Sequence, residues 1–232
     1  MTIEKLIKGG EIIAPATTTT AVIDPGTKMS LHDLLMEAIP LETGEIIDNE
    51  VIEVGKTTEV KYTFVTRWRG REVTPLCSYE IDGMEISGKS YTASYTPQQP
   101  GDIEITVKSS YNGFESVDKF KVVATYPSYF GAMSQGIPTA EDIKKLESHL
   151  YGYKHVTLWD VNLTDQIYVY AYPKYMGDLS CIKDRNGFCM MCKGIDGSTF
   201  KKTEVTIDSI PYNVYYMESP CTIRGFQFKC KP

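Results

Sequence analysis

Apolar and polar positions alternate in short runs between residues 45 and 125, and turn residues separate the runs. In the run from Ile103 to Val107, apolar residues point to one face and polar residues to the other, which predicts a half-buried strand. Asn112-Gly113 then predicts a tight hairpin, since both residues tolerate positive φ. The predicted strands are 51–54, 58–67, 77–81, 91–95, 102–109 and 116–123. Residues 45–125 are therefore predicted to form an immunoglobulin-like β-sandwich.

Residues 126–232 follow a different pattern and predict a second, β-rich domain with one α-helix. The helix is predicted over 139–151, where Thr139 is the N-cap and Asp142 completes a capping pattern. Its apolar face would consist of Ile143, Leu146 and Leu150. Strands are predicted after the helix, at 154–163, 166–172, 188–194, 202–207, 212–217 and 222–229.

The apolar residues of segment 1–44 are too irregularly spaced to form a core element, and the segment is rich in Thr and punctuated by Pro. Backbone of this kind favours extended conformations, so the segment predicts an N-terminal attachment arm that becomes ordered against another subunit. Ser30 caps a short amphipathic helix predicted over 31–39, which Pro40 ends. The predicted fold class is mainly β: an extended arm with a short helix, an immunoglobulin-like sandwich, and a β-rich C-terminal domain with one helix.

Composition narrows the possible partners of the 232-residue chain. A formal net charge of -6 and a sequence pI of 5.2 argue against nucleic acid or anionic lipid as the main partner, because both require a basic surface. No apolar run reaches the roughly 18 residues of a membrane span, and the first residues lack the features of a signal peptide. Synthesis in a reducing cytoplasm is expected, and the six cysteines are expected to be free thiols.

The sequence contains no motif for a known catalytic site. It has three histidines, none in H-E-x-x-H, and no nucleophile elbow, phosphate-binding loop or dinucleotide fingerprint. We therefore expect neither an enzyme nor a bound cofactor. A β-sandwich hydrolase with two carboxylates distant in sequence stays open as the least supported class.

One pair of cysteines has the spacing of a metal-binding turn, Cys189-Met-Met-Cys192. A closed zinc site usually shows a second pair with similar spacing, and Cys221 and Cys230 are too far apart for that. On a strand, Cys189 and Cys192 would also face opposite sides of the sheet. The pair is a weak metal candidate, and free thiols are the favoured interpretation.

Two clusters of side chains are candidates for binding. Arg67, Arg69 and Arg71 would share one strand face and bind phosphate, an acidic glycan or a carboxylate-rich partner, although a solvated hairpin is the favoured interpretation. Amphipathic Tyr suits either a sugar-stacking platform or a seam between subunits or domains, and the seam is favoured. The tyrosines that would form this stripe are Tyr168, Tyr170 and Tyr172, and Trp159 adds to the sugar-binding interpretation.

Both ends of the chain resemble known virion proteins. The N-terminal segments resemble the leader of tailed-phage fibre and head-decoration proteins: Glu4-Lys-Leu-Ile-Lys-Gly-Gly10, Pro15-Ala-Thr-Thr-Thr-Thr-Ala-Val22, Asp24-Pro25 and Leu31-His-Asp-Leu-Leu35. The C-terminal segments resemble a β-rich module of phage tail, baseplate and fibre proteins: Tyr129-Phe-Gly131, Ile167-Tyr-Val-Tyr-Ala-Tyr-Pro173, Gly177-Asp-Leu-Ser180, Val205-Thr-Ile207 and Tyr212-Asn-Val-Tyr215. Proteins of crAss-like gut phages are the closest fit.

The resemblance implies a structural role in the virion, in the head fibre, collar, tail or baseplate, with other virion proteins as partners and a homo-oligomeric state. Assembly would take place in the cytoplasm of the host bacterium. The apolar residues of the arm are expected to contact the neighbouring subunit: Ile3, Leu6, Ile7, Ile12, Ile13, Val22, Leu31, Leu34 and Leu35. The alternative is a carbohydrate-binding module that mediates adhesion to host or mucosal glycans.

Overall fold

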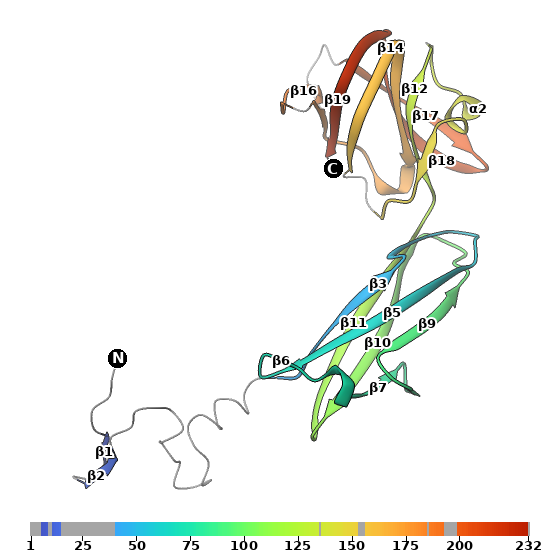
Figure 1. Ribbon diagram of the computed structural model, residues 1–232. Coiled ribbons are helices and arrows are strands. Elements are labelled where there is room, and N and C mark those ends of the chain that lie inside the picture. The colour runs from blue at the N-terminus through green and yellow to red at the C-terminus, as the bar shows by residue number, and fades with distance from the viewer. Residues whose placement is uncertain are drawn as a thin grey trace. The chain divides into compact units, whose positions relative to one another are not determined.

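The computed structural model is mainly β, with several sheets and one short α-helix among the described residues, which confirms the mainly β class (Figure 1). It describes residues 6–8, 11–14, 40–134, 136–152, 156–184, 186–192 and 199–231. For the strand residues 6–8, 11–14, 156–160, 192 and 225–231 it describes the backbone alone. The short helix predicted at 31–39 lies outside the described residues. Among the described helices, none is long and apolar enough to span a membrane.

The chain forms two compact units that alternate along the sequence. The first consists of Met1–Asp48, Val60–Ala93 and Glu104–Phe120, and the second of Asn49–Glu59, Ser94–Ile103 and Lys121–Pro232. The domain boundaries proposed from the sequence, at 44 and 125, remain predictions.

Two sheets make up the part of the chain predicted as a sandwich. One contains β3 (Glu42–Asp48), β5 (Thr58–Trp68), β6 (Arg71–Glu72) and β9 (Ser90–Tyr95). The other has the order β4 (Val51–Glu53), β11 (Phe114–Thr125), β10 (Gly101–Tyr111), β7 (Ser78–Ile81) and β8 (Met84–Ile86). β3 pairs antiparallel with β5, whereas β4 pairs parallel with β11. Consecutive edge strands thus join different sheets, an arrangement compatible with an immunoglobulin-like sandwich.

The alternating pattern of β5 explains how the two sheets pack. Val60, Tyr62, Phe64 and Thr66 are buried, and the residues between them are more exposed. The ring of Phe64 stacks at 5.3 Å on Tyr79 of the facing sheet. These contacts hold the two sheets face to face around an aromatic core.

Two local predictions in this region are confirmed. Each of the six strands predicted from the alternation is present to within three residues at either end. Asn112 (φ 49°) and Gly113 (φ 82°) form the tight turn between β10 and β11, as expected for a hairpin of this type.

The first strand of this region begins earlier than the sequence predicts. β3 begins at Glu42, within the segment assigned to the arm, and the side chain of Leu41 is only 3% exposed.

The second unit contains an eight-stranded sheet built around the long strand β14 (Val156–Pro173). Residues 167–171 of β14 pair with β12 (Ser128–Met133), and residues 169–173 pair with β18 (Ile210–Met217). The earlier part of β14 pairs with β19 (Cys221–Lys231). The remaining strands are β13 (Glu147–His149), β15 (Cys181–Lys183), β16 (Cys189–Cys192) and β17 (Phe200–Ile207).

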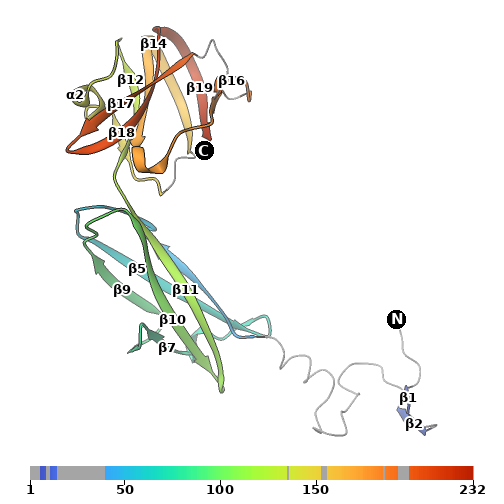
Figure 2. The same ribbon diagram turned by 180° about the vertical axis from the view of Figure 1, so that it is seen from behind.

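The helix predicted over 139–151 is wrong beyond its first turn. α2 spans only Ala140–Ile143 and lies beside β12 and β17 (Figure 2). Thr139 and Asp142 do form the capping box, since each backbone N–H donates to the side chain of the other residue. Leu146 then packs over Gly131 of β12, and the following residues pair with β12 as strand β13. Pairing with an open sheet edge thus replaces the hydrogen bonds of a longer helix.

Candidate functional site

The arm residues that the structure describes form a β-hairpin rather than a single extended strand. β1 (Leu6–Lys8) pairs antiparallel with β2 (Glu11–Ala14), with Ile7 opposite Ile12. Leu6, Ile7, Ile12 and Ile13 thus lie on these strands. The other predicted arm contacts lie outside the described residues: Ile3, Val22, Leu31, Leu34 and Leu35.

This hairpin is a sheet of its own. Among the described residues, neither β1 nor β2 pairs with a further strand. An isolated two-stranded hairpin is marginally stable in water, and its unpaired edges are templates for pairing with another chain. The hairpin therefore has the properties of an element that a partner stabilises.

The three arginines do not share one strand face, so that prediction is wrong. Arg67 is the second-to-last residue of β5, Arg69 (φ 53°) lies in the turn, and Arg71 begins β6. On the sheet, Arg67 lies between Glu42 of β3 and Glu72 of β6. Two neighbouring carboxylates offset the charge of Arg67. This geometry weakens the case for a phosphate site and agrees with the favoured interpretation of a solvated hairpin.

Trp68 is the centre of a cluster that the sequence analysis missed, which we call the tip cluster: Trp68, Arg69, Tyr111 and Phe114. The Arg69 guanidinium carbon lies 4.1 Å from the centre of the Trp68 ring, a cation–π contact. The rings of Tyr111 and Phe114 lie 5.5 Å and 5.1 Å from Trp68. Two hairpins more than 40 residues apart supply these side chains, so spacing along the sequence gave no signal. All four side chains are partly exposed.

The predicted tyrosine stripe is buried in the core of the second unit. Tyr168, Tyr170 and Tyr172 are at most 2% exposed, and Ile167, Val169 and Ala171 on the opposite face are fully buried. Tyr172 donates a hydrogen bond to the Gly177 carbonyl at 2.8 Å. Because both faces of this strand are covered by the chain itself, the tyrosines form neither an exposed sugar platform nor an exposed seam. Trp159 lies in β14, and its side chain lies outside the described part.

The cysteines differ from expectation at one position. Cys77, Cys181 and Cys221 are free thiols, but Cys189 is disulfide-bonded. The prediction of free thiols is therefore wrong for Cys189, and its sulfur is not available as a thiolate ligand. Within the described residues, no group of three His, Cys, Asp or Glu side chains is placed to hold a metal ion.

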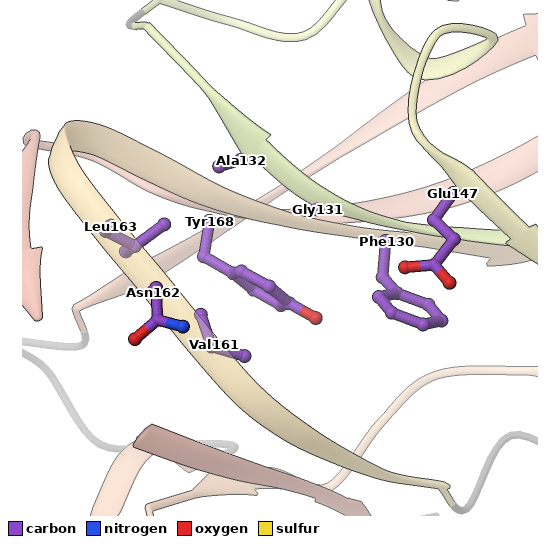
Figure 3. Close-up of a pocket in the computed structure, with 8 residues that line it drawn as sticks. All are labelled: Phe130, Gly131, Ala132, Glu147, Val161, Asn162, Leu163 and Tyr168. Carbon is purple, nitrogen blue, oxygen red and sulfur yellow. The ribbon is translucent and has the colours of Figure 1, made fainter. Parts of the chain in front are cut away.

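A cavity of about 170 Å³ opens between β12, β13 and β14, all in the second unit (Figure 3). Its apolar wall includes Phe130 of β12 and the buried Tyr168 and Val161 of β14. Polar groups reach it from two sides: the carboxylate of Glu147 and the amide of the exposed Asn162. None of these residues was singled out as cavity-lining from the sequence.

The side chains beside the cavity hold one another in position. Phe130 and Glu147 are direct cross-strand partners, so their side chains lie on the same face of the sheet. The His149 ring stacks on Phe130 at 4.8 Å, and its Nε2 lies 3.1 Å from the Glu147 carboxylate. An aromatic ring and a carboxylate are thereby preorganised at the cavity mouth. Such a site is suited to binding a small polar molecule with an apolar face.

Comparison with known proteins gives no assignment. No protein-family model matches the chain, and no curated protein matches it significantly.

Proposed function

We propose that the chain is a structural component of a tailed-phage virion, such as a fibre, decoration or tail-associated protein. Its N-terminal arm anchors it to neighbouring virion subunits, and its β domains project from the particle. The residues that resemble phage leader and tail segments support this proposal, and so does the mainly β fold. In this role the chain assembles with other virion proteins and with copies of itself.

The observation that carries the proposal is the separate β1–β2 sheet of the arm. Two short strands bury too little apolar surface to be stable alone, so a neighbouring subunit is the natural source of the missing contacts. The apolar residues Ile7 and Ile12 are partners in the backbone register of the hairpin. An edge of the hairpin pairs with a sheet of the neighbour, and these side chains enter its pockets.

The arm ends where the buried core of the sandwich begins. Leu41 is 3% exposed and Thr43 is 8% exposed, so both belong to the folded unit. Removing a buried Leu costs about 2–5 kcal/mol of stability. A deletion test must therefore stop at residue 39. Removal of residues 1–44 would also destabilise the sandwich, so that loss of folding could not be distinguished from loss of anchoring.

The test compares the full chain with a variant lacking residues 1–39 during particle assembly. The truncated chain is expected to unfold at the temperature of the full chain but to be depleted from purified particles at least tenfold. Ile7→Asn should reduce incorporation, whereas the matched change Lys8→Asn on the same strand should not. Normal incorporation of the truncated chain contradicts the proposal.

A further inference from the structure

The cavity in Figure 3 lies where β14 changes its partners. β14 pairs with β12 only from Ile167 onward, opposite Met133. Before that point its pairing with β19 is interrupted by shifts of register on both sides of Val161 and again after Leu163. Bulges of this kind bend a strand and re-aim its side chains, and they are frequent next to binding sites. The bend separates this part of β14 from β12 and leaves the cavity between them.

The size and the lining of the cavity restrict the ligand. A volume of about 170 Å³ corresponds to roughly six water molecules at the density of the liquid. The walls present the apolar surfaces of Phe130 and Tyr168, which favour a ligand with C–H groups on one face. Glu147 accepts hydrogen bonds, and the Asn162 amide both donates and accepts them. The cavity therefore fits a small ring that is apolar on its face and hydroxylated on its edge.

We propose that this cavity is a binding site for a single neutral sugar ring, with Phe130 as the stacking surface and Glu147 and Asn162 as the hydroxyl-binding groups. Of the tyrosine stripe, Tyr168 lines this cavity, whereas Tyr170 and Tyr172 are not among its described lining residues. The described lining residues belong to β12, β13 and β14 and not to the arm. Binding of sugar would add adhesion to the structural role, and neither function requires the other.

A sugar fits the polar groups better than a cation does. An ammonium ion next to an aromatic ring needs only acceptors, whereas an amide such as that of Asn162 both donates and accepts hydrogen bonds, as sugar hydroxyl groups do. The Glu147 carboxylate is also held close to the His149 ring at 3.1 Å, which occupies one of its oxygens. A hydroxylated ring can donate to the second carboxylate oxygen and can also form a hydrogen bond with the Asn162 amide.

The test is a titration of the full-length protein with glucose, galactose, mannose and N-acetylglucosamine, followed by amide chemical shifts, with tetramethylammonium as the competing probe. At least one sugar should bind saturably, with shifts centred on Phe130 and Glu147. Glu147→Gln should weaken binding about tenfold, because it replaces a charged acceptor by a neutral one. Ala132→Leu should abolish binding by filling the cavity, which Ala132 lines.

Two exposed residues of the same unit provide matched controls. Glu141→Gln changes a carboxylate on α2, and Phe188→Ala removes an aromatic ring that is 71% exposed. Both variants should bind the sugar as the unchanged protein does. The proposal is overturned if no sugar binds up to its solubility limit, if only tetramethylammonium binds, or if Glu147→Gln and Ala132→Leu bind normally while remaining folded.

Discussion

The hydroxyl oxygen of Thr43 lies 2.5 Å from that of Ser109, 66 residues later in the chain, and both side chains are buried. Thr43 lies on β3 and Ser109 on β10, so this hydrogen bond joins the two sheets of the sandwich. Thr43 also contacts the hydroxyl of Thr66 at 3.1 Å, which in turn lies 2.8 Å from that of Tyr79. A connected network of buried hydroxyl groups specifies how the sheets align, because each unpaired member is costly.

The network predicts the effect of removing one hydroxyl group. Thr43→Val keeps the shape of the side chain but leaves Ser109 without this partner, so it should lower the free energy of unfolding by about 1–3 kcal/mol. In the double variant Thr43→Val/Ser109→Ala, the second change should cost less than it does alone. Urea unfolding, followed by tryptophan fluorescence, measures both. Strictly additive losses would show that the two hydroxyl groups act independently.

Buried tyrosines should make the protein sensitive to high pH. Burial raises the pKa of Tyr172 and Tyr212 far above the ordinary value near 10. Above pH 10 the unfolded chain loses phenol protons that the folded chain keeps, so stability is intact below about pH 10 and falls as the pH rises further. Each group contributes a slope of about 1.4 kcal/mol per pH unit.

Denaturant unfolding at pH 7, 10 and 11 tests this prediction. Tyr172→Phe removes one titrating group, so its stability should fall less steeply above pH 10 than that of the unchanged protein. The variant should lose about 1 kcal/mol at pH 7, because the hydrogen bond to the Gly177 carbonyl is missing. Equal slopes for the two proteins would show that Tyr172 does not titrate on unfolding in this range.

The cysteines should react in two classes. Alkylation without a reductant should leave Cys189 unmodified, because it is disulfide-bonded, and prior reduction should expose it. Burial raises the pKa of the Cys77 and Cys221 thiols, so both should react slowly at pH 7 and faster as the pH rises. Peptide mass spectrometry distinguishes the sites. Modification of Cys189 before reduction would contradict the disulfide.

Local patterns predicted the strands well because alternation and turn chemistry act over a few residues. The hairpin at Asn112-Gly113 and the capping box of Thr139 and Asp142 both formed as expected. The rest of the 139–151 helix did not form, since its apolar spacing also suits packing of Leu146 over Gly131. A short helix has little stability of its own, so competition with a sheet edge decided the outcome.

The candidate sites were harder to predict because they depend on which strands become neighbours. The alternation of Tyr168, Tyr170 and Tyr172 predicts a binding stripe on one face of a strand, although the small and branched apolar residues between them indicate burial of both faces. Trp68 and Tyr111 meet only through the pairing of distant hairpins. The cavity at Phe130 depends on irregular register in β14, and no sequence pattern specified that irregularity.

The central claim is that the arm gains its stability from a neighbouring virion subunit. Hydrogen exchange of the backbone amides of Leu6–Lys8 and Glu11–Ala14, compared between the free protein and purified particles, tests it most directly. The free hairpin should exchange with little protection, because two short strands are marginally stable alone. In particles the same amides should be protected at least tenfold more strongly, whereas unchanged exchange after assembly would contradict anchoring through the arm.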